Sequence, residues 1–152
     1  MKKISHILII DDDPIHNYLC RKVISKMNVC DKIHFESNGL EGIKYLKKLI
    51  EGNKPLPEII LVDVYMPVLD GFGFIERFEK LPYNGKDVPY IAFISASEKS
   101  KEHKKMDQLT RFISKPIDVS KLEEILFTVS NSQNIPSTLN ETKLPDSLKM
   151  SS

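Results

Sequence analysis

The sequence predicts an α/β fold: a doubly wound, five-stranded parallel sheet with helices on both faces. The prediction rests on two observations. Five short apolar runs alternate along the chain with amphipathic, helix-like segments, an order typical of strands joined by crossover helices. Runs such as residues 58–63 (EIILVD) are apolar without alternation, as expected for strands that are covered on both faces.

The expected strands follow these apolar runs and occupy residues 4–10, 32–36, 58–62, 89–94 and 110–114. After the first run, Pro14 falls where a first helical turn would begin, and Asp13 is the expected N-cap. The apolar face expected for this helix consists of residues at helical spacing, namely Ile15, Tyr18, Leu19, Val23 and Met27.

Four further helices are expected after Asn38, over residues 70–81, over residues 97–109 and over residues 118–129. Two of them begin with the pattern of a capping box, formed by Asn38 with Glu41 and by Ser120 with Glu123. Asp70–Gly71 is typical of a turn at a helix start. The segment 97–109 is very polar, and its lysines indicate a solvated helix face.

The 152 residues, of which 41% are hydrophobic and 28% charged, fit one domain. We expect this domain over residues 1–130 and a disordered tail over residues 131–152, where Ser, Asn and Pro outnumber apolar residues. A net charge of +1 gives no reason to expect nucleic acid or an anionic membrane as a partner. No apolar run approaches the roughly 20 residues of a membrane span.

The N-terminal stretch MKKISHILIIDDD contains two lysines and an apolar run, but acids follow at once and no small-residue cleavage site appears. A signal peptide is therefore not expected. Cys20 and Cys30 form neither a metal-spaced cluster nor a disulfide framework. The expected location is a reducing cytoplasm.

Polar side chains gather at the carboxyl ends of the expected strands, where parallel α/β sheets bind ligands. In chain order they are Asp11, Asp12, Asp13, Asp63, Ser95 and Lys115. Carboxylates this close repel one another and need a cation, and an oxygen-only set without Cys or His favours Mg²⁺ over zinc. Because Mg²⁺ also binds phosphoryl oxygens, and a lysine and a hydroxyl lie nearby, the pattern predicts phosphoryl transfer.

Four blocks, ILIIDDDP, IILVDVYMPVLDG, IAFISAS and FISKP, follow one another in this order. Over residues 3–130 the chain resembles the response-regulator receiver domain of two-component systems, especially stand-alone receivers of the chemotaxis-response-regulator type. The resemblance implies a flavodoxin-like (βα)5 sheet with strand order 2-1-3-4-5. It also implies a cis peptide bond before Pro116, where an ordinary X-Pro bond is cis in only about 5% of cases.

The resemblance further implies the roles of individual residues. Asp63 would be the phosphoacceptor and Asp12 a direct ligand of Mg²⁺ (or Mn²⁺), with Asp11 assisting through water or hydrogen bonds. The third ligand would be the main-chain carbonyl of Tyr65. Lys115 would pair with the phosphoryl group, and Ser95 would hydrogen-bond to it after transfer.

By the same resemblance, the chain would be a phosphoacceptor switch and not a turnover enzyme. Asp63 would attack the phosphorus of a phosphohistidine on a sensor histidine kinase or histidine phosphotransfer protein, forming an aspartyl phosphate that water later hydrolyses. No DNA-binding, ATPase or cyclase segment follows residue 130. The expected output is therefore contact with a further protein, or relay of the phosphoryl group.

Two residues depart from the common receiver pattern. Phe112 stands where many receivers carry a tyrosine, three positions before the lysine, so a hydroxyl contact to a partner is absent. Tyr65 is bulky at a position that flanks the phosphoryl group, and we expect it to obstruct the attacking water. This predicts slow self-dephosphorylation.

Two other functions fit parts of the same pattern. A degenerate receiver would act as an interaction scaffold without being phosphorylated. A phosphatase of the haloacid-dehalogenase type would use Asp11 as nucleophile and Asp13 as acid, but this leaves Asp63 without a role, and only a helical pattern follows Lys115, where that family needs a further acidic pair. Taken singly, Asp13 is better explained as a helix cap than as a ligand.

Overall fold

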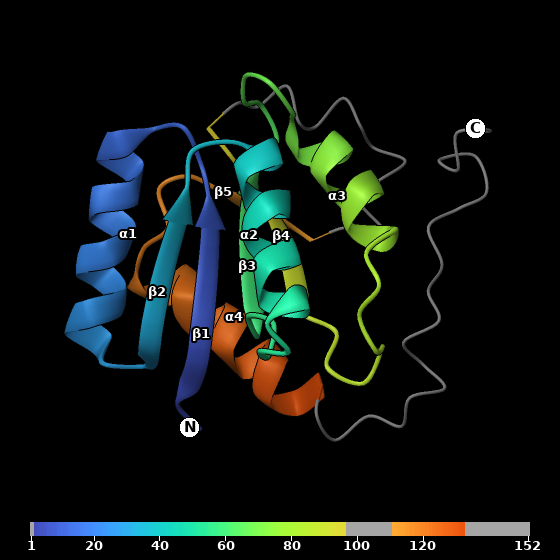
Figure 1. Cartoon of the computed structure of the whole chain (residues 1–152). Coiled ribbons are helices and arrows are strands. Elements are labelled where there is room, and N and C mark those ends of the chain that lie inside the picture. Colours follow the sequence, from blue (N-terminus) through green and yellow to red (C-terminus); the bar gives the residue numbers. More distant parts are fainter. Residues whose placement is uncertain (1, 97–110, 133–152) are drawn as a thin grey trace.

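The sheet has the predicted architecture. The structure, a computed structural model, describes residues 2–96 and 111–132. Within them, five strands form one parallel sheet in the order β2-β1-β3-β4-β5 (Figure 1). The strands are β1 (Ile4–Ile10), β2 (Cys30–Glu36), β3 (Ile59–Asp63), β4 (Tyr90–Ser95) and β5 (Phe112–Ser114). The expected fold class and strand order are therefore confirmed.

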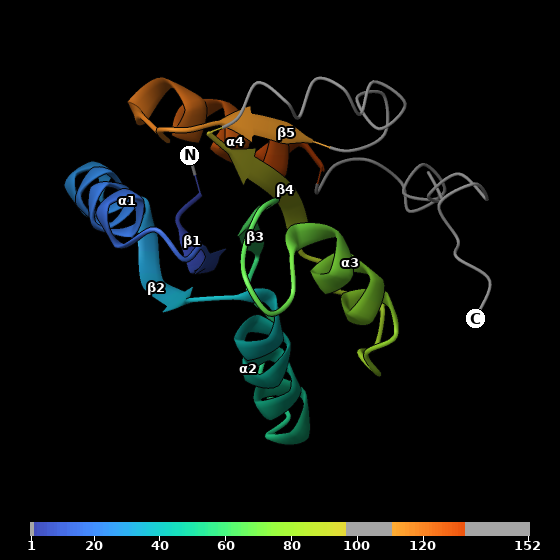
Figure 2. The ribbon, with the colours of Figure 1, turned by 90° about the horizontal axis from the view of Figure 1, so that it is seen from above.

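In the part of the chain that the structure describes, two pairs of helices cover the two faces of the sheet. The described helices are α1 (Pro14–Met27), α2 (Gly39–Glu51), α3 (Gly71–Glu79) and α4 (Val119–Ser132). Seen from above, α1 and α4 lie on one face, and α2 and α3 lie on the other (Figure 2). The helix predicted over residues 97–109 lies outside the described residues.

The side-chain alternation of the central strands divides the interior into two cores. Ile7 and Ile9 of β1 face α1 and α4, where they pack with the apolar side of α4. Leu8 and Ile10 face α2 and α3, where Phe74 is fully buried. Residues 7–10 of β1 and 59–62 of β3 are buried on both faces, and both stretches are continuously apolar. No described helix is long and apolar enough to cross a membrane.

The buried face of α1 agrees only in part with the predicted one, since of the predicted residues Val23 and Met27 pack against the core. His16, Cys20 and Ile24 are buried against the sheet, whereas Ile15 is 71% exposed, and Tyr18 and Leu19 are also exposed. Both sets have helical spacing, so the apolar pattern alone does not fix how the helix is rotated about its axis. The rotation places a histidine beneath the carboxyl edge of the sheet.

Three of the expected helix starts are confirmed. The Asp13 carboxylate accepts hydrogen bonds from the N–H groups of Ile15 and His16, and Pro14 occupies the first helical position. The Asn38 side chain caps α2, and the Asp70 carboxylate caps α3. Each cap satisfies a backbone donor that the helix cannot satisfy itself.

The last helix begins earlier than the predicted Ser120/Glu123 capping box. The Asp118 carboxylate accepts a hydrogen bond from the Lys121 N–H at 2.9 Å, and the helix starts at Val119. Asp118 takes the cap position because its carboxylate is among the strongest N-cap acceptors. The helix ends at Ser132, two residues past the predicted boundary at 130. The tail expected beyond it lies outside the described residues.

Gly71 permits a close approach between the loop after β3 and the start of α3. Its N–H donates to the Val64 carbonyl at 3.0 Å. A Cβ atom at this position would lie 2.6 Å from the Asp63 carbonyl oxygen and 3.0 Å from the Phe93 ring. Both obstacles are rigid, because one is backbone and the other is a packed aromatic ring. Glycine is therefore required for α3 to lie against the end of β3.

We predict that Gly71→Ala lowers the free energy of unfolding by about 1–3 kcal/mol, the usual cost of overpacking, measured by urea unfolding. Gly73→Ala is the matched control. There an added Cβ meets mainly the flexible end of the Leu69 side chain, and alanine gains helix propensity. Equal stabilities of the two variants would contradict the steric role of Gly71.

Candidate functional site

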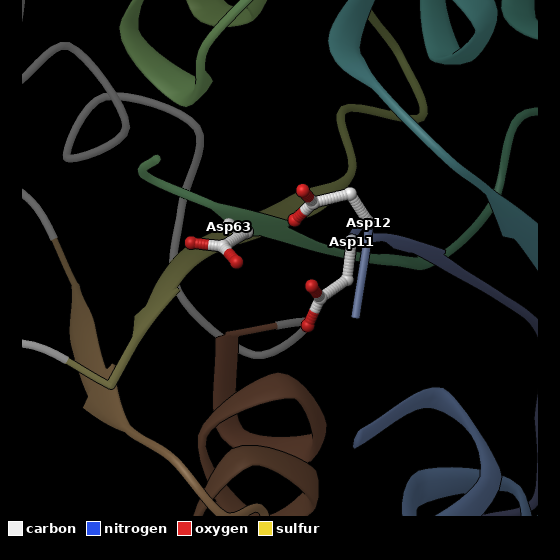
Figure 3. A group of neighbouring side chains, drawn as sticks. All are labelled: Asp11, Asp12 and Asp63. Atoms are coloured by element: carbon white, nitrogen blue, oxygen red, sulfur yellow. The ribbon is translucent and has the colours of Figure 1, made fainter. Parts of the chain in front are cut away.

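Three carboxylates meet at the carboxyl edge of the sheet. Asp11 and Asp12 follow β1, and Asp63 is the last residue of β3. β1 and β3 are adjacent strands at the point where the strand order reverses, which is the usual ligand site of such sheets. Oxygen atoms of the three side chains lie within 4.8 Å of one another, and the carboxyl groups face a shared space (Figure 3). The sequence prediction that they come together is confirmed.

Asp11 is fully buried, and protein donors surround its carboxylate. Oδ1 accepts a hydrogen bond from the Asp13 N–H at 2.9 Å. Oδ2 lies 2.8 Å from His16 Nδ1 and 2.8 Å from Lys115 Nζ. Burial alone would raise the pKa of Asp11, but the His16, Lys115 and Asp13 hydrogen bonds outweigh it and lower the pKa to about 2. Asp11 is thus a fixed negative charge at neutral pH.

Lys115 joins the two buried carboxylates. Its Nζ lies 2.8 Å from Asp11 Oδ2 and 2.8 Å from Asp63 Oδ2, and its side chain is only 9% exposed. Burial would lower the pKa of Lys115, but the hydrogen bonds and charges of the two aspartates raise it overall. One ammonium group therefore compensates part of the charge of two buried carboxylates.

Asp63 is buried but has fewer donors than Asp11. Oδ1 accepts a hydrogen bond from the Tyr65 N–H at 3.0 Å, and Oδ2 accepts one from Lys115. Burial raises the pKa of Asp63, and the nearby Asp11 charge adds to this, so the two hydrogen bonds do not bring the pKa back to its ordinary value. Of the two buried carboxylates, Asp63 is therefore the one whose ionised form is less stabilised.

Asp12 and Asp13 differ from their neighbours in what contacts them. The Asp12 side chain is exposed, and in residues 2–96 and 111–132 no hydrogen-bond donor contacts its carboxylate. Asp13 is committed to the helix cap described above. Of the three consecutive acids, Asp12 is thus the one whose oxygens remain available to a ligand.

The other predicted site residues lie at the same edge of the sheet. Ser95 ends β4 and is buried, and its carbonyl accepts a hydrogen bond from the Lys115 N–H at 3.0 Å. The Tyr65 side chain is 49% exposed. Phe112 stacks on Phe93 with a centroid distance of 5.3 Å. The peptide bond between Lys115 and Pro116 is cis, as the resemblance implied.

Several residues that contact this site were not identified from the sequence, among them Asn17, whose side-chain amide donates to the Asp11 carbonyl at 2.9 Å. His16 contacts Asp11, and Lys121 Nζ donates to the carbonyl oxygens of Ser114 and Pro116 at 2.8 and 2.9 Å, on either side of Lys115. The capping pattern at Asp13 gives the position of His16 in the first turn of α1. No sequence signal indicates that its ring faces inward, because the exposed residues of that helix are also apolar.

Comparison with known proteins agrees with this geometry. The family model of the response regulator receiver domain matches residues 7–127. The chain is 34% identical to the sensor histidine kinase CheAY of Helicobacter pylori over 112 residues, which cover 72% of this chain and 13% of that protein. It is 28% identical to the probable C4-dicarboxylate response regulator DctR of Priestia megaterium over 126 residues, 82% of this chain and 51% of that protein. The chain thus spans about half or less of these relatives.

Solved structures share the fold. A two-component response regulator from Cytophaga hutchinsonii superposes with a TM-score of 0.76 and 26% identity, covering 86% of this chain and 99% of that one. The receiver domain of the Arabidopsis thaliana histidine kinase CKI1, solved with Mg²⁺ and BeF3⁻, superposes with a TM-score of 0.65 at 19% identity, over 84% of this chain and 90% of that one. With the family model covering most of the chain, we conclude that this protein belongs to the response regulator receiver domain family of two-component signalling.

Proposed function

We propose that the chain is a Mg²⁺-dependent phosphoacceptor switch in which Asp63 takes a phosphoryl group from a histidine kinase or a histidine phosphotransfer protein. Receiver domains are regulatory domains that interact with such proteins, and phosphorylation is typical of the family. The observation that carries the proposal is the position of Asp63. It is a buried carboxylate with a raised pKa, and it lies between a lysine and two further carboxylates.

The donor set fits Mg²⁺. Receiver domains bind this ion at an acidic pocket, and the cluster here offers carboxylate oxygens, the ligands that Mg²⁺ prefers. Asp12 and Asp63 are the proposed direct ligands, together with the main-chain carbonyl of Tyr65. Asp11 already accepts three hydrogen bonds, which supports an indirect role through water. Mn²⁺ has similar ligand preferences and is a possible substitute.

The bound ion would screen the repulsion between the carboxylates and the incoming phosphoryl oxygens. In the transfer step, an Asp63 carboxylate oxygen forms a bond to phosphorus as the phosphorus–nitrogen bond of the donor breaks. The donor imidazole keeps the electron pair of that bond. Lys115 would exchange its contact with Asp63 for one with a phosphoryl oxygen, and Ser95 would donate a hydrogen bond to the same group. Water later attacks the phosphorus and restores the Asp63 carboxylate.

The two other functions remain outcomes of the test. A scaffold without phosphorylation would keep this fold but take up no phosphate. A phosphatase would need Asp13 as a general acid, whereas the Asp13 carboxylate accepts two backbone N–H groups as a helix cap. This geometry supports the phosphoacceptor over the phosphatase.

We predict that acetyl phosphate adds one phosphoryl group to the wild-type chain only when Mg²⁺ is present, and that Asp63→Asn prevents the addition, because the amide cannot attack phosphorus. Intact mass spectrometry measures the gain. Asp118→Asn is the matched control, since it changes an exposed aspartate that is not one of the three clustered acids and should be phosphorylated normally. No gain together with no Mg²⁺ binding would favour the scaffold, and phosphate release that survives loss of Asp63 would favour the phosphatase.

Asp63→Asn is also expected to stabilise the fold when metal is absent. The pKa of Asp63 is raised above 3.8 in the folded chain, so the contribution of Asp63 to wild-type stability declines as pH rises from 3.8 through its folded-state pKa. The amide does not ionise, and its oxygen can still accept a hydrogen bond from Lys115. Urea unfolding in EDTA should therefore show a larger advantage of the variant at pH 7 than at pH 4.

Mg²⁺ should then stabilise the wild type more than Asp63→Asn, because the ion binds the folded state and needs both carboxylates. The Asp118→Asn control should follow the wild type at both pH values, since asparagine and aspartate cap helices about equally well. If the free energy of unfolding had the same pH dependence in Asp63→Asn and wild type, the raised pKa of Asp63 would be contradicted.

Tyr65→Ala is expected to speed the loss of phosphate from Asp63 several-fold, because we expect the bulky side chain of Tyr65, which is 49% exposed, to obstruct the attacking water. The decay of the phosphorylated mass after removal of acetyl phosphate measures the rate. Tyr18→Ala is the control, since Tyr18 is similarly exposed, at 56%, but lies on α1. An unchanged decay rate in Tyr65→Ala would contradict the proposal that Tyr65 obstructs the attacking water.

A further inference from the structure

We infer that His16 is a positioning residue. It links the acidic cluster (Asp11, Asp12 and Asp63) to the backbone of the Lys115 loop, residues 115–118 between β5 and α4. Its ring lies between Asp11 and Ile117 and contacts both. The importance of this link for phosphoryl transfer rests on the proposed function. The link itself is a feature of the folded chain and can be tested without phosphorylation.

The two contacts fix which ring nitrogen carries the proton. The Ile117 N–H can only donate, and it donates to His16 Nε2 at 3.3 Å. Nε2 must therefore be unprotonated. Nδ1 then carries the hydrogen and donates it to Asp11 Oδ2 at 2.8 Å. His16 is 4% exposed, and with this placement of the hydrogen both ring nitrogens are satisfied.

The link closes a ring of contacts around the site. Asp11 Oδ2 accepts from both His16 Nδ1 and Lys115 Nζ. The N–H of Ile117, two residues after Lys115, donates to the other ring nitrogen of His16. A shift of the Asp11 carboxylate therefore moves the Lys115 ammonium group directly. It also moves the backbone of the Lys115 loop, because His16 connects Asp11 to Ile117. The positions of the two groups are coupled by geometry.

Other contacts also hold the backbone near Lys115. Lys121 Nζ binds the carbonyl oxygens of Ser114 and Pro116, and the Lys115 N–H binds Ser95. These tethers come from α4 and β4, whereas His16 comes from α1. His16 thus joins the loop to α1 and, through Asp11, to the acidic cluster.

A purely structural explanation is that the His16 ring fills a space at the end of the core. Cys20 Sγ lies 3.6 Å from His16 Nε2 and 3.8 Å from Nδ1, which is consistent with ordinary packing. The two explanations predict different effects when the ring is replaced by a side chain that keeps only one of its two hydrogen bonds. Loss of packing would lower stability without a selective effect on either Asp11 or the Lys115 loop.

Two amide variants separate the contacts. In His16→Asn, the side-chain amide can occupy the position of Nδ1 and donate to Asp11, but it is too short to reach Ile117. In His16→Gln, the longer side chain can present an oxygen at the position of Nε2 to the Ile117 N–H, but loses the Asp11 contact. His16→Leu loses both, and Ile24→Val, a core change two turns along the same helix, controls for general loosening.

Three measurements are needed. A two-bond ¹H–¹⁵N NMR spectrum of the wild type reports the protonated ring nitrogen. An amide-shift titration with Mg²⁺ gives the affinity for the metal, and acetyl phosphate at saturating Mg²⁺ gives the phosphorylation rate. Thermal unfolding confirms that each variant is folded. Should His16→Leu fail to fold, the two amide variants still carry the comparison.

The expected result is a proton on Nδ1 and a split between the amide variants. His16→Gln should weaken Mg²⁺ binding about tenfold, the usual cost of losing a partner of a metal-site carboxylate, while its rate at saturating Mg²⁺ stays near that of the wild type. His16→Asn should bind Mg²⁺ within about twofold of the wild type but react about tenfold more slowly, because Lys115 is less well placed.

The inference is overturned if Nε2 carries the proton, or if both amide variants match Ile24→Val in Mg²⁺ affinity and rate. Failure of the proposed function is a separate outcome. In that case the wild type takes up no phosphate, while the NMR spectrum and the Mg²⁺ titration still decide whether His16 supports Asp11.

Discussion

The structure at the carboxyl edge depends on one ammonium group shared between two buried carboxylates. Lys115 lies 2.8 Å from both Asp11 and Asp63, and burying either acid without such a partner would be very costly. The compensation is incomplete, because a third carboxylate lies nearby and one cation faces several negative charges. Asp11 is stabilised by three donors, while Asp63 retains a raised pKa. The imbalance leaves the site with an affinity for added positive charge.

Much of this arrangement is predictable from the sequence. Continuous apolar runs identified the strands, and parallel strands place their carboxyl ends at one edge, so Asp11, Asp63 and Lys115 were expected to meet. The caps at Asp13 and Asn38 were predictable because the capping interaction is local. The strands β2 and β5 were less well bounded, since edge strands are partly exposed and their apolar pattern is weaker.

The two errors, at α1 and at α4, have different physical origins. α1 carries two candidate apolar stripes, and the sheet packs against the one that contains His16, Cys20 and Ile24. Burying a polar side chain such as His16 is costly unless it finds hydrogen-bond partners, which here are Asp11 and the Ile117 N–H. Asp11 is only five positions before His16, but Ile117 is 101 positions away, so no local pattern could indicate the second partner. At α4, Asp118 displaced the Ser120 capping box because two acceptors competed for one helix start.

The sequence separation within the site bears on how the chain folds. Lys115 and Asp63 are 52 positions apart, and Asp11 is as distant from Asp63 on the other side, so the cluster assembles only when β1, β3 and the end of β5 are in place. Pairings between distant segments form late, because loop closure must precede them. Interactions made after the folding transition state slow unfolding more than they speed folding. A ligand bound at this edge would therefore act mainly by prolonging the lifetime of the folded chain.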